Sequence, residues 1–180
     1  MCGDKDKPEQ CFSTDLTSFK AQESSKEGHL TGGLVVTNDT NLLLRIAGYT
    51  RSTEVFDVKN QVWHSNLIGN MTDRIRGFST IATDDEIYLL GGFSDIQDDY
   101  TKNIWKWVSG HPKFEVAGQL LQIRMNSASV LEKGKIYTIG GLDNLKAEFF
   151  DIDAEVSTSL NSVTTPQIFS QLVPRAFLQC

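Results

Sequence analysis

The chain has 180 residues, 39% of them hydrophobic, and a formal net charge of −6 at pH 7. It is long enough to bury a sizeable core, and its acidic balance argues against binding to nucleic acid or to an anionic membrane surface. Its apolar runs are much shorter than the roughly 20 residues of a membrane-spanning helix. We therefore expect a soluble globular protein with neither nucleic acid nor membrane as a partner.

Residues 1–28 are polar and show no periodic pattern, and we interpret them as a flexible leader. They lack the apolar core of a secretory signal, which favours a cytoplasmic location. The sequons that begin at Asn38 and Asn70 keep an extracellular origin open if the N-terminus is incomplete. The cysteines do not decide the compartment, because Cys2 and Cys11 could form a disulfide while Cys180 would be left over.

A β-rich run that ends in two small residues occurs three times, at residues 42–49, 86–93 and 135–142. The second small residues are Gly48, Gly92 and Gly141, at spacings of 44 and 49 residues. This is the period of a propeller blade. Each run follows a strand-like segment and a polar turn, so the sequence predicts three hairpins. The preceding strands are residues 33–37, 78–83 and 127–131.

Two further strands are predicted after each pair of small residues. Residues 54–58 in the first copy correspond to 148–152 in the third, and we match them with 103–107 in the second. A turn then leads to Trp63 in the first copy, and Phe114 lies at a comparable distance in the second. Four antiparallel strands per copy are typical of a propeller blade.

These copies resemble the kelch repeat family: a strand enters a double glycine, an aromatic–Asp strand follows, and a Trp lies about seven residues further on. The resemblance covers residues 30–153, and residues 173–177 look like the start of another copy. Ala47 and Ser157 depart from the family pattern. The resemblance implies an all-β fold, a kelch-type β-propeller fragment of four-stranded antiparallel blades. Its blades would span 29–73, 74–122 and 123–172, with a further blade starting at 173–180.

We find no motif for chemistry. The glycine pairs are not followed by a helix, as a nucleotide-binding loop requires. Asp57 and Asp151 occupy equivalent positions before turns, where a carboxylate accepts backbone hydrogen bonds. The three histidines, His29, His64 and His111, lack metal-ligand spacing. We therefore predict no catalytic residue, no cofactor and no metal, and hence no enzyme.

Antiparallel order places the loop between the second and third strands at the same end as the links between blades, and irregular loops often carry function. On these loops, an acidic segment and four arginines are our candidates for partner binding. They are Asp95, Ile96, Asp98, Asp99 and Tyr100, with Arg74, Arg76, Arg124 and Arg175. Kelch propellers are similar in holding peptide motifs on this face.

The sequence thus predicts a non-catalytic module for protein–protein interaction, with a protein or peptide partner whose identity it does not give. Two alternatives stay open. One is a fragment of a propeller enzyme, either copper oxidase-like or sugar-processing, with its ligands on other blades. The other is a fragment of an extracellular adhesion protein, for which glycans on Asn38 or Asn70 would be the evidence.

Overall fold

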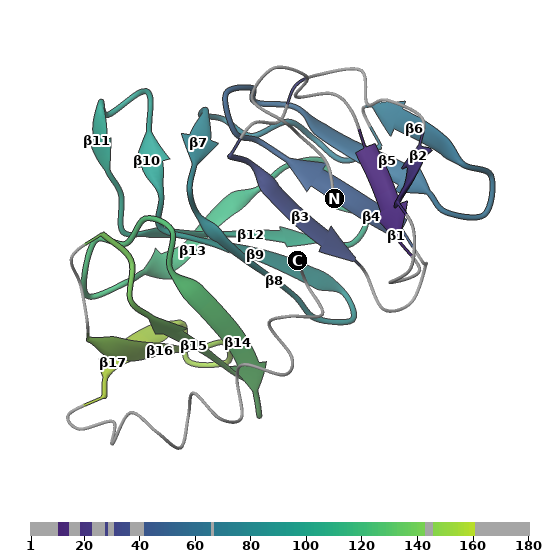
Figure 1. Cartoon of the computed structure of the whole chain (residues 1–180). Coiled ribbons are helices and arrows are strands. Elements are labelled where there is room, and N and C mark those ends of the chain that lie inside the picture. The colour runs from purple at the N-terminus through teal and green to yellow at the C-terminus, as the bar shows by residue number, and fades with distance from the viewer. Residues whose placement is uncertain are drawn as a thin grey trace.

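The computed structural model (Figure 1) describes residues 11–14, 19–22, 28, 31–36, 42–65, 67–142 and 146–160. Every regular element in these ranges is a β-strand, so the protein is all-β, as the sequence predicts. Strands β1 (Cys11–Thr14) and β2 (Phe19–Gln22) form an antiparallel pair, so this part of the segment that we interpreted as a flexible leader is regular structure. No helix in the described ranges is long and apolar enough to cross a membrane.

Three four-stranded antiparallel sheets follow along the chain, each with its strands in sequence order. The first sheet contains β3 (Gly33–Val36), β4 (Leu42–Ile46), β5 (Thr53–Asp57) and β6 (Val62–Ser65). The second contains β8 (Ser79–Ala82), β9 (Glu86–Leu90), β12 (Asn103–Val108) and β13 (Glu115–Gln119). The third contains β14 (Ala128–Glu132), β15 (Lys135–Ile139), β16 (Ala147–Asp151) and β17 (Val156–Ser159). This repetition is compatible with part of a propeller. The blade boundaries stay a prediction.

A smaller sheet is formed by segments that connect the larger ones. It contains β7 (Ile75–Arg76), β10 (Phe93–Ser94) and β11 (Asp99–Tyr100), in the order β11-β10-β7. In Figure 1, β10 and β11 stand apart from the four-stranded sheets as a projecting hairpin. This hairpin is an insertion between β9 and β12 of the second sheet.

The three predicted hairpins are confirmed, as β3–β4, β8–β9 and β14–β15. The β14–β15 hairpin shows most directly why the chain turns at this point. Lys133 and Gly134 both have positive φ, at 50° and 72°, and Glu132 pairs with Lys135 across the turn. Positive φ at both central residues gives a two-residue hairpin turn whose twist matches that of the strands.

Our alignment of the second copy was wrong by two residues. Trp105 pairs with Leu89, as Glu54 pairs with Arg45 in the first sheet. Trp105, and not Asn103, is therefore the counterpart of Glu54. The cause is the loop of the second copy, which contains the β10–β11 hairpin and makes the distance from the glycines to the third strand an unreliable guide to register.

The sheets pack face to face. Because side chains alternate between the two faces of a strand, one sheet can contribute to a different cluster on each face. Leu44, Ile46 and Val55 of the first sheet are buried in a cluster with residues of the second sheet and its preceding link. The members from the second sheet and link include Ile75, Phe78, Ile87, Leu89 and Trp105. The opposite face of the second sheet supplies Ile81, Tyr88, Leu90 and Ile104 to a cluster with Ile136 and Phe150 of the third sheet. In the described part of the chain, the core therefore consists of two successive interfaces between sheets and a small third cluster of Phe56 and Trp63 on the first sheet.

Backbone hydrogen bonds also join the starts of the three repeats. The Gly77 N–H donates to the Thr31 carbonyl at 3.0 Å, and the Asn126 N–H donates to the Gly77 carbonyl at 2.6 Å. All three residues have positive φ, between 57° and 67°. Equivalent residues in successive repeats therefore share one unusual conformation and one bonding pattern, which supports a structural repeat.

Candidate binding surface

The loops that join β4 to β5, β9 to β12 and β15 to β16 lie at one end of the sheets, together with the links that join one sheet to the next. We call this the loop end. Hydrogen bonds confirm that links and loops meet there. The N–H of Gly48 donates to the Ile75 carbonyl at 2.8 Å, and that of Gly92 donates to the Arg124 carbonyl at 2.6 Å.

The β10–β11 hairpin is held in place by a buried carboxylate, that of Asp73, which is 7% exposed. Asp73 accepts hydrogen bonds from the Ser94 hydroxyl and, at 3.2 Å, from the Ile96 backbone N–H. The Ser94 oxygen in turn accepts the Gln97 N–H at 3.1 Å. The hairpin tip is thus fixed by its own polar contacts with the link before β7, at residues that sequence reasoning did not identify.

The fixed tip presents its side chains to solvent. Ile96 is 67% exposed, and Asp98 and Asp99 are also exposed. Tyr100 is half-buried, because its ring meets the Phe93 ring edge-on at 5.4 Å between centroids. An ordered hairpin with an exposed aliphatic side chain and two carboxylates can contact a partner at low ordering cost.

Arg76 lies at the base of this hairpin, among aromatic rings. Its guanidinium carbon is 4.2 Å from the centroid of the Phe93 ring and 5.0 Å from that of Tyr49. Its Nη1 group also donates to the Asp95 carboxylate in an ion pair. Tyr49 and Phe93 each follow the second small residue of their copy, whereas the third copy has Leu142 at this position.

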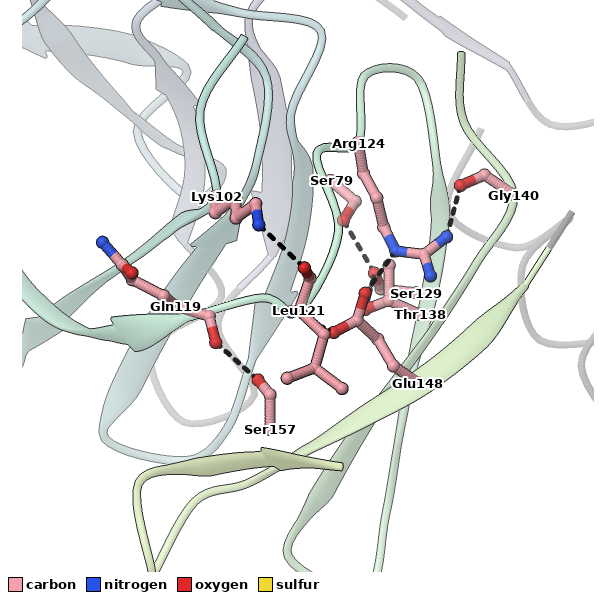
Figure 2. Close-up of polar contacts among 10 residues, drawn as sticks. All are labelled: Ser79, Lys102, Gln119, Leu121, Arg124, Ser129, Thr138, Gly140, Glu148 and Ser157. Carbon is pink, nitrogen blue, oxygen red and sulfur yellow. Dashed lines mark hydrogen bonds and ion pairs between the residues drawn. The ribbon is translucent and has the colours of Figure 1, made fainter. Parts of the chain in front are cut away.

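The other arginine candidates have different environments. Arg74 is exposed beside this cluster. Arg124 is completely buried, with its Nε 2.8 Å from Glu148 and its Nη1 2.6 Å from the Gly140 carbonyl. Figure 2 shows its side chain reaching toward both of these groups. Arg124 therefore acts inside the fold and is no part of the surface, while Arg175 lies outside the described residues.

The network in Figure 2 joins the second and third sheets. Glu148 also accepts the Leu121 N–H at 2.6 Å, so its carboxylate fixes the link as well as Arg124. At the adjacent inner strands, the Ser79 and Ser129 hydroxyls are 2.7 Å apart. These polar groups are buried and satisfied mainly by one another, which indicates a structural role.

The two repeated aspartates lie in turns at the opposite end. Asp57 accepts the Lys59 and Asn60 N–H groups, each at 2.9 Å, and a backbone hydrogen bond from Asn60 is the main cause that lowers its pKa. Asp151 accepts the Ala154 N–H at 3.1 Å, which lowers its pKa in the same way. These contacts agree with our interpretation that both carboxylates fix turns.

Several of the remaining residues that the sequence singled out lie outside the described ranges. Asn70 is exposed, whereas Asn38, Cys2 and Cys180 lie outside the described residues. Within the described ranges, no group of three or more His, Cys, Asp or Glu side chains could hold a metal ion.

A scan against protein-family models finds no match for this chain, and a search of curated proteins also finds none.

Proposed function

We propose that the chain is part of a kelch-type β-propeller and that its loop end binds a protein or peptide partner without chemistry of its own. The kelch assignment rests on the double glycines, the aromatic–Asp strands and Trp63. The succession of four-stranded antiparallel sheets, packed face to face, supports it.

One observation carries the binding proposal: the buried Asp73 carboxylate fixes a hairpin whose tip is solvent-exposed. Burying a carboxylate costs free energy, and here its hydrogen bonds hold a loop outside the core. An exposed Ile96 on such a loop is a suitable anchor for a partner, since the loop is already ordered.

The proposal is tested by capturing partners on the immobilised 180-residue chain. The test variant replaces Ile96, Asp98 and Asp99 with Ser and keeps Tyr100, whose ring packs against Phe93. We expect it to lose most of the captured partner while its thermal unfolding stays unchanged.

The matched control is Glu132→Gln with Lys133→Gln, because both side chains are exposed in the β14–β15 turn at the opposite end. This control should capture the partner as the unmodified chain does. Equal capture by all three proteins would remove the hairpin from the proposal, and capture by none of them would reject the binding function.

A further inference from the structure

The strongest unexplained feature of the loop end is the environment of Arg76. Two rings from successive repeats, Tyr49 and Phe93, both lie within cation–π distance of its guanidinium. Arginine normally loses much side-chain freedom when it binds a ligand, and contact with rings reduces that loss in advance. Among the described residues, the Arg76 guanidinium donates one hydrogen bond, from Nη1 to Asp95, so its other N–H groups are available.

The Asp95 carboxylate, which pairs with Arg76, can be replaced by a carboxylate from a partner. The side chains of Arg76 and Asp95 are 21% and 31% exposed, so solvent and salt reach both groups and screen part of their attraction. The hairpin does not depend on this pair, because Asp73 holds Ser94 and Ile96. The Asp95 backbone is fixed separately, by its N–H bond of 3.1 Å to the Arg74 carbonyl. Its side chain can therefore leave Arg76 while the loop stays in place.

A second guanidinium lies close to Arg76. Arg74 is exposed, has no ion pair within the described part of the chain, and lies two residues before Arg76. Residues two apart in an extended segment point to the same side, so the second guanidinium adds positive charge near the first. Asp99 pairs with Ser94 across the hairpin and Asp98 precedes it, so these two carboxylates flank Asp95 and reduce the attraction for an anion.

We propose that Arg76 binds a carboxylate of the partner, and that Asp95 occupies the place of this carboxylate in the free protein. This rests on the proposed binding function and specifies its partner as a peptide segment with an acidic side chain or a free C-terminus. In the exchange, the Asp95 carboxylate rotates into solvent as the partner's carboxylate takes its place, so the Arg76 guanidinium stays paired. Asp95 thereby competes with the partner and lowers its affinity.

The test measures fluorescence anisotropy of labelled peptides with the full chain at low ionic strength. The probes are an oligoglutamate with an amidated C-terminus, an oligoglycine with a free C-terminus, and an oligolysine. Asp95→Asn removes the internal competitor, and we expect it to tighten binding of a carboxylate probe by about three- to tenfold. Arg76→Lys keeps the charge but loses the planar group beside the rings, and should weaken binding about tenfold or more.

Glu132→Gln is the matched control for Asp95→Asn, because it removes one negative charge at the opposite end and should leave affinity unchanged. The first two probes separate an acidic side chain from a C-terminal carboxylate as the source. Three outcomes would overturn the proposal: no carboxylate probe binds, Asp95→Asn binds no tighter than Glu132→Gln, or oligolysine binds best. If partner capture still depends on the hairpin in any of these cases, the binding function stands and only the carboxylate partner is rejected.

Discussion

The link into the second sheet has Ile75 at the position where the link into the third sheet has Arg124. In both cases the backbone carbonyl accepts the N–H of the second glycine of the preceding repeat, Gly48 or Gly92. Ile75 is buried in the apolar cluster that contains Trp105, whereas Arg124 is buried against Glu148.

Trp105 and Glu148 are themselves equivalent, since they pair with Leu89 and Thr138 at the same place in the second and third strands. Equivalent backbone positions thus hold two apolar side chains at one interface and an ion pair at the next. Arg124 and Glu148 are 0% and 2% exposed, and the Arg124 Nη2 atom has no hydrogen-bond partner among the described residues. The cost of desolvation therefore offsets much of the attraction between the two charges. The comparison with the first interface indicates that packing at these positions does not require charged side chains.

The largest expected effect comes from breaking the ion pair on one side. Arg124→Met leaves Glu148 buried without its cation, and we expect the free energy of unfolding to fall by about 3–5 kcal/mol. Urea unfolding followed by tryptophan fluorescence would measure this loss.

The double variant Arg124→Met with Glu148→Met makes the second interface apolar, like the first. We expect it to recover most of the stability lost in the single variant, because no unpaired charge is left. A double variant as unstable as the single one would show that the two interfaces are not interchangeable. The hydrogen bond from Leu121 to Glu148 would then be the first alternative cause to test.

A smaller effect is expected at Gly92, which contacts the link before the second sheet and the link before the third. Its φ is +101°, and a Cβ there would lie 2.8 Å from the Arg76 carbonyl oxygen and 3.0 Å from an Ile75 methyl carbon, while its N–H holds Arg124. We expect Gly92→Val to lower the free energy of unfolding by about 2–3 kcal/mol, through backbone strain and this clash.

Gly110 provides the matched control for that change. It also has positive φ, at +82°, but nothing lies within 4 Å of the position that a Cβ would take, so Gly110→Val adds strain without a clash. Its loss should be clearly smaller, about 1 kcal/mol. Similar losses for the two variants would mean that strain alone matters at Gly92, and that the close approach of the link does not.

The sequence predicted the fold well because its signals are local. Each hairpin depends on strand patterns and turn residues within about ten positions, and the repeat period follows from the same local pattern occurring three times. The acidic segment was correctly expected between the second and third strands of the second copy, but its β10–β11 hairpin was not predicted.

The arginines could not be sorted from the sequence. The period pairs Arg74 with Arg124, but the hydrogen bonds pair Ile75 with Arg124. Adjacent residues in an extended chain point to opposite sides, so an error of one position exchanges an exposed side chain for a buried one. The Asp73 contacts and the rings around Arg76 join residues about 20 or more positions apart, and no local pattern predicts them.

The smallest expected effect concerns the turns at the end away from the loops, where the first and third sheets again agree and the second differs. Asp57 and Asp151 are equivalent, and the second sheet has Val108 at that position. Hydrogen bonds lower the pKa of both aspartates, Asp57 chiefly through the Asn60 N–H and Asp151 chiefly through the Ala154 N–H. A carboxyl group whose pKa is lower in the folded state stabilises the fold at neutral pH, and this contribution is lost as the pH falls through the folded-state pKa.

Asp57→Asn and Asp151→Asn should therefore each reduce the difference in melting temperature between neutral and acidic pH. Asp57 should give the larger change, because it also accepts the Asn60 side-chain amide at 2.7 Å. Asp151 instead has Lys135 at 3.4 Å, and the effect of this partly exposed pair should weaken with added salt, unlike that of Asp57. If both variants keep the full acid dependence of the unmodified chain, these carboxylates do not contribute to its pH-dependent stability, and other carboxyl groups must account for it.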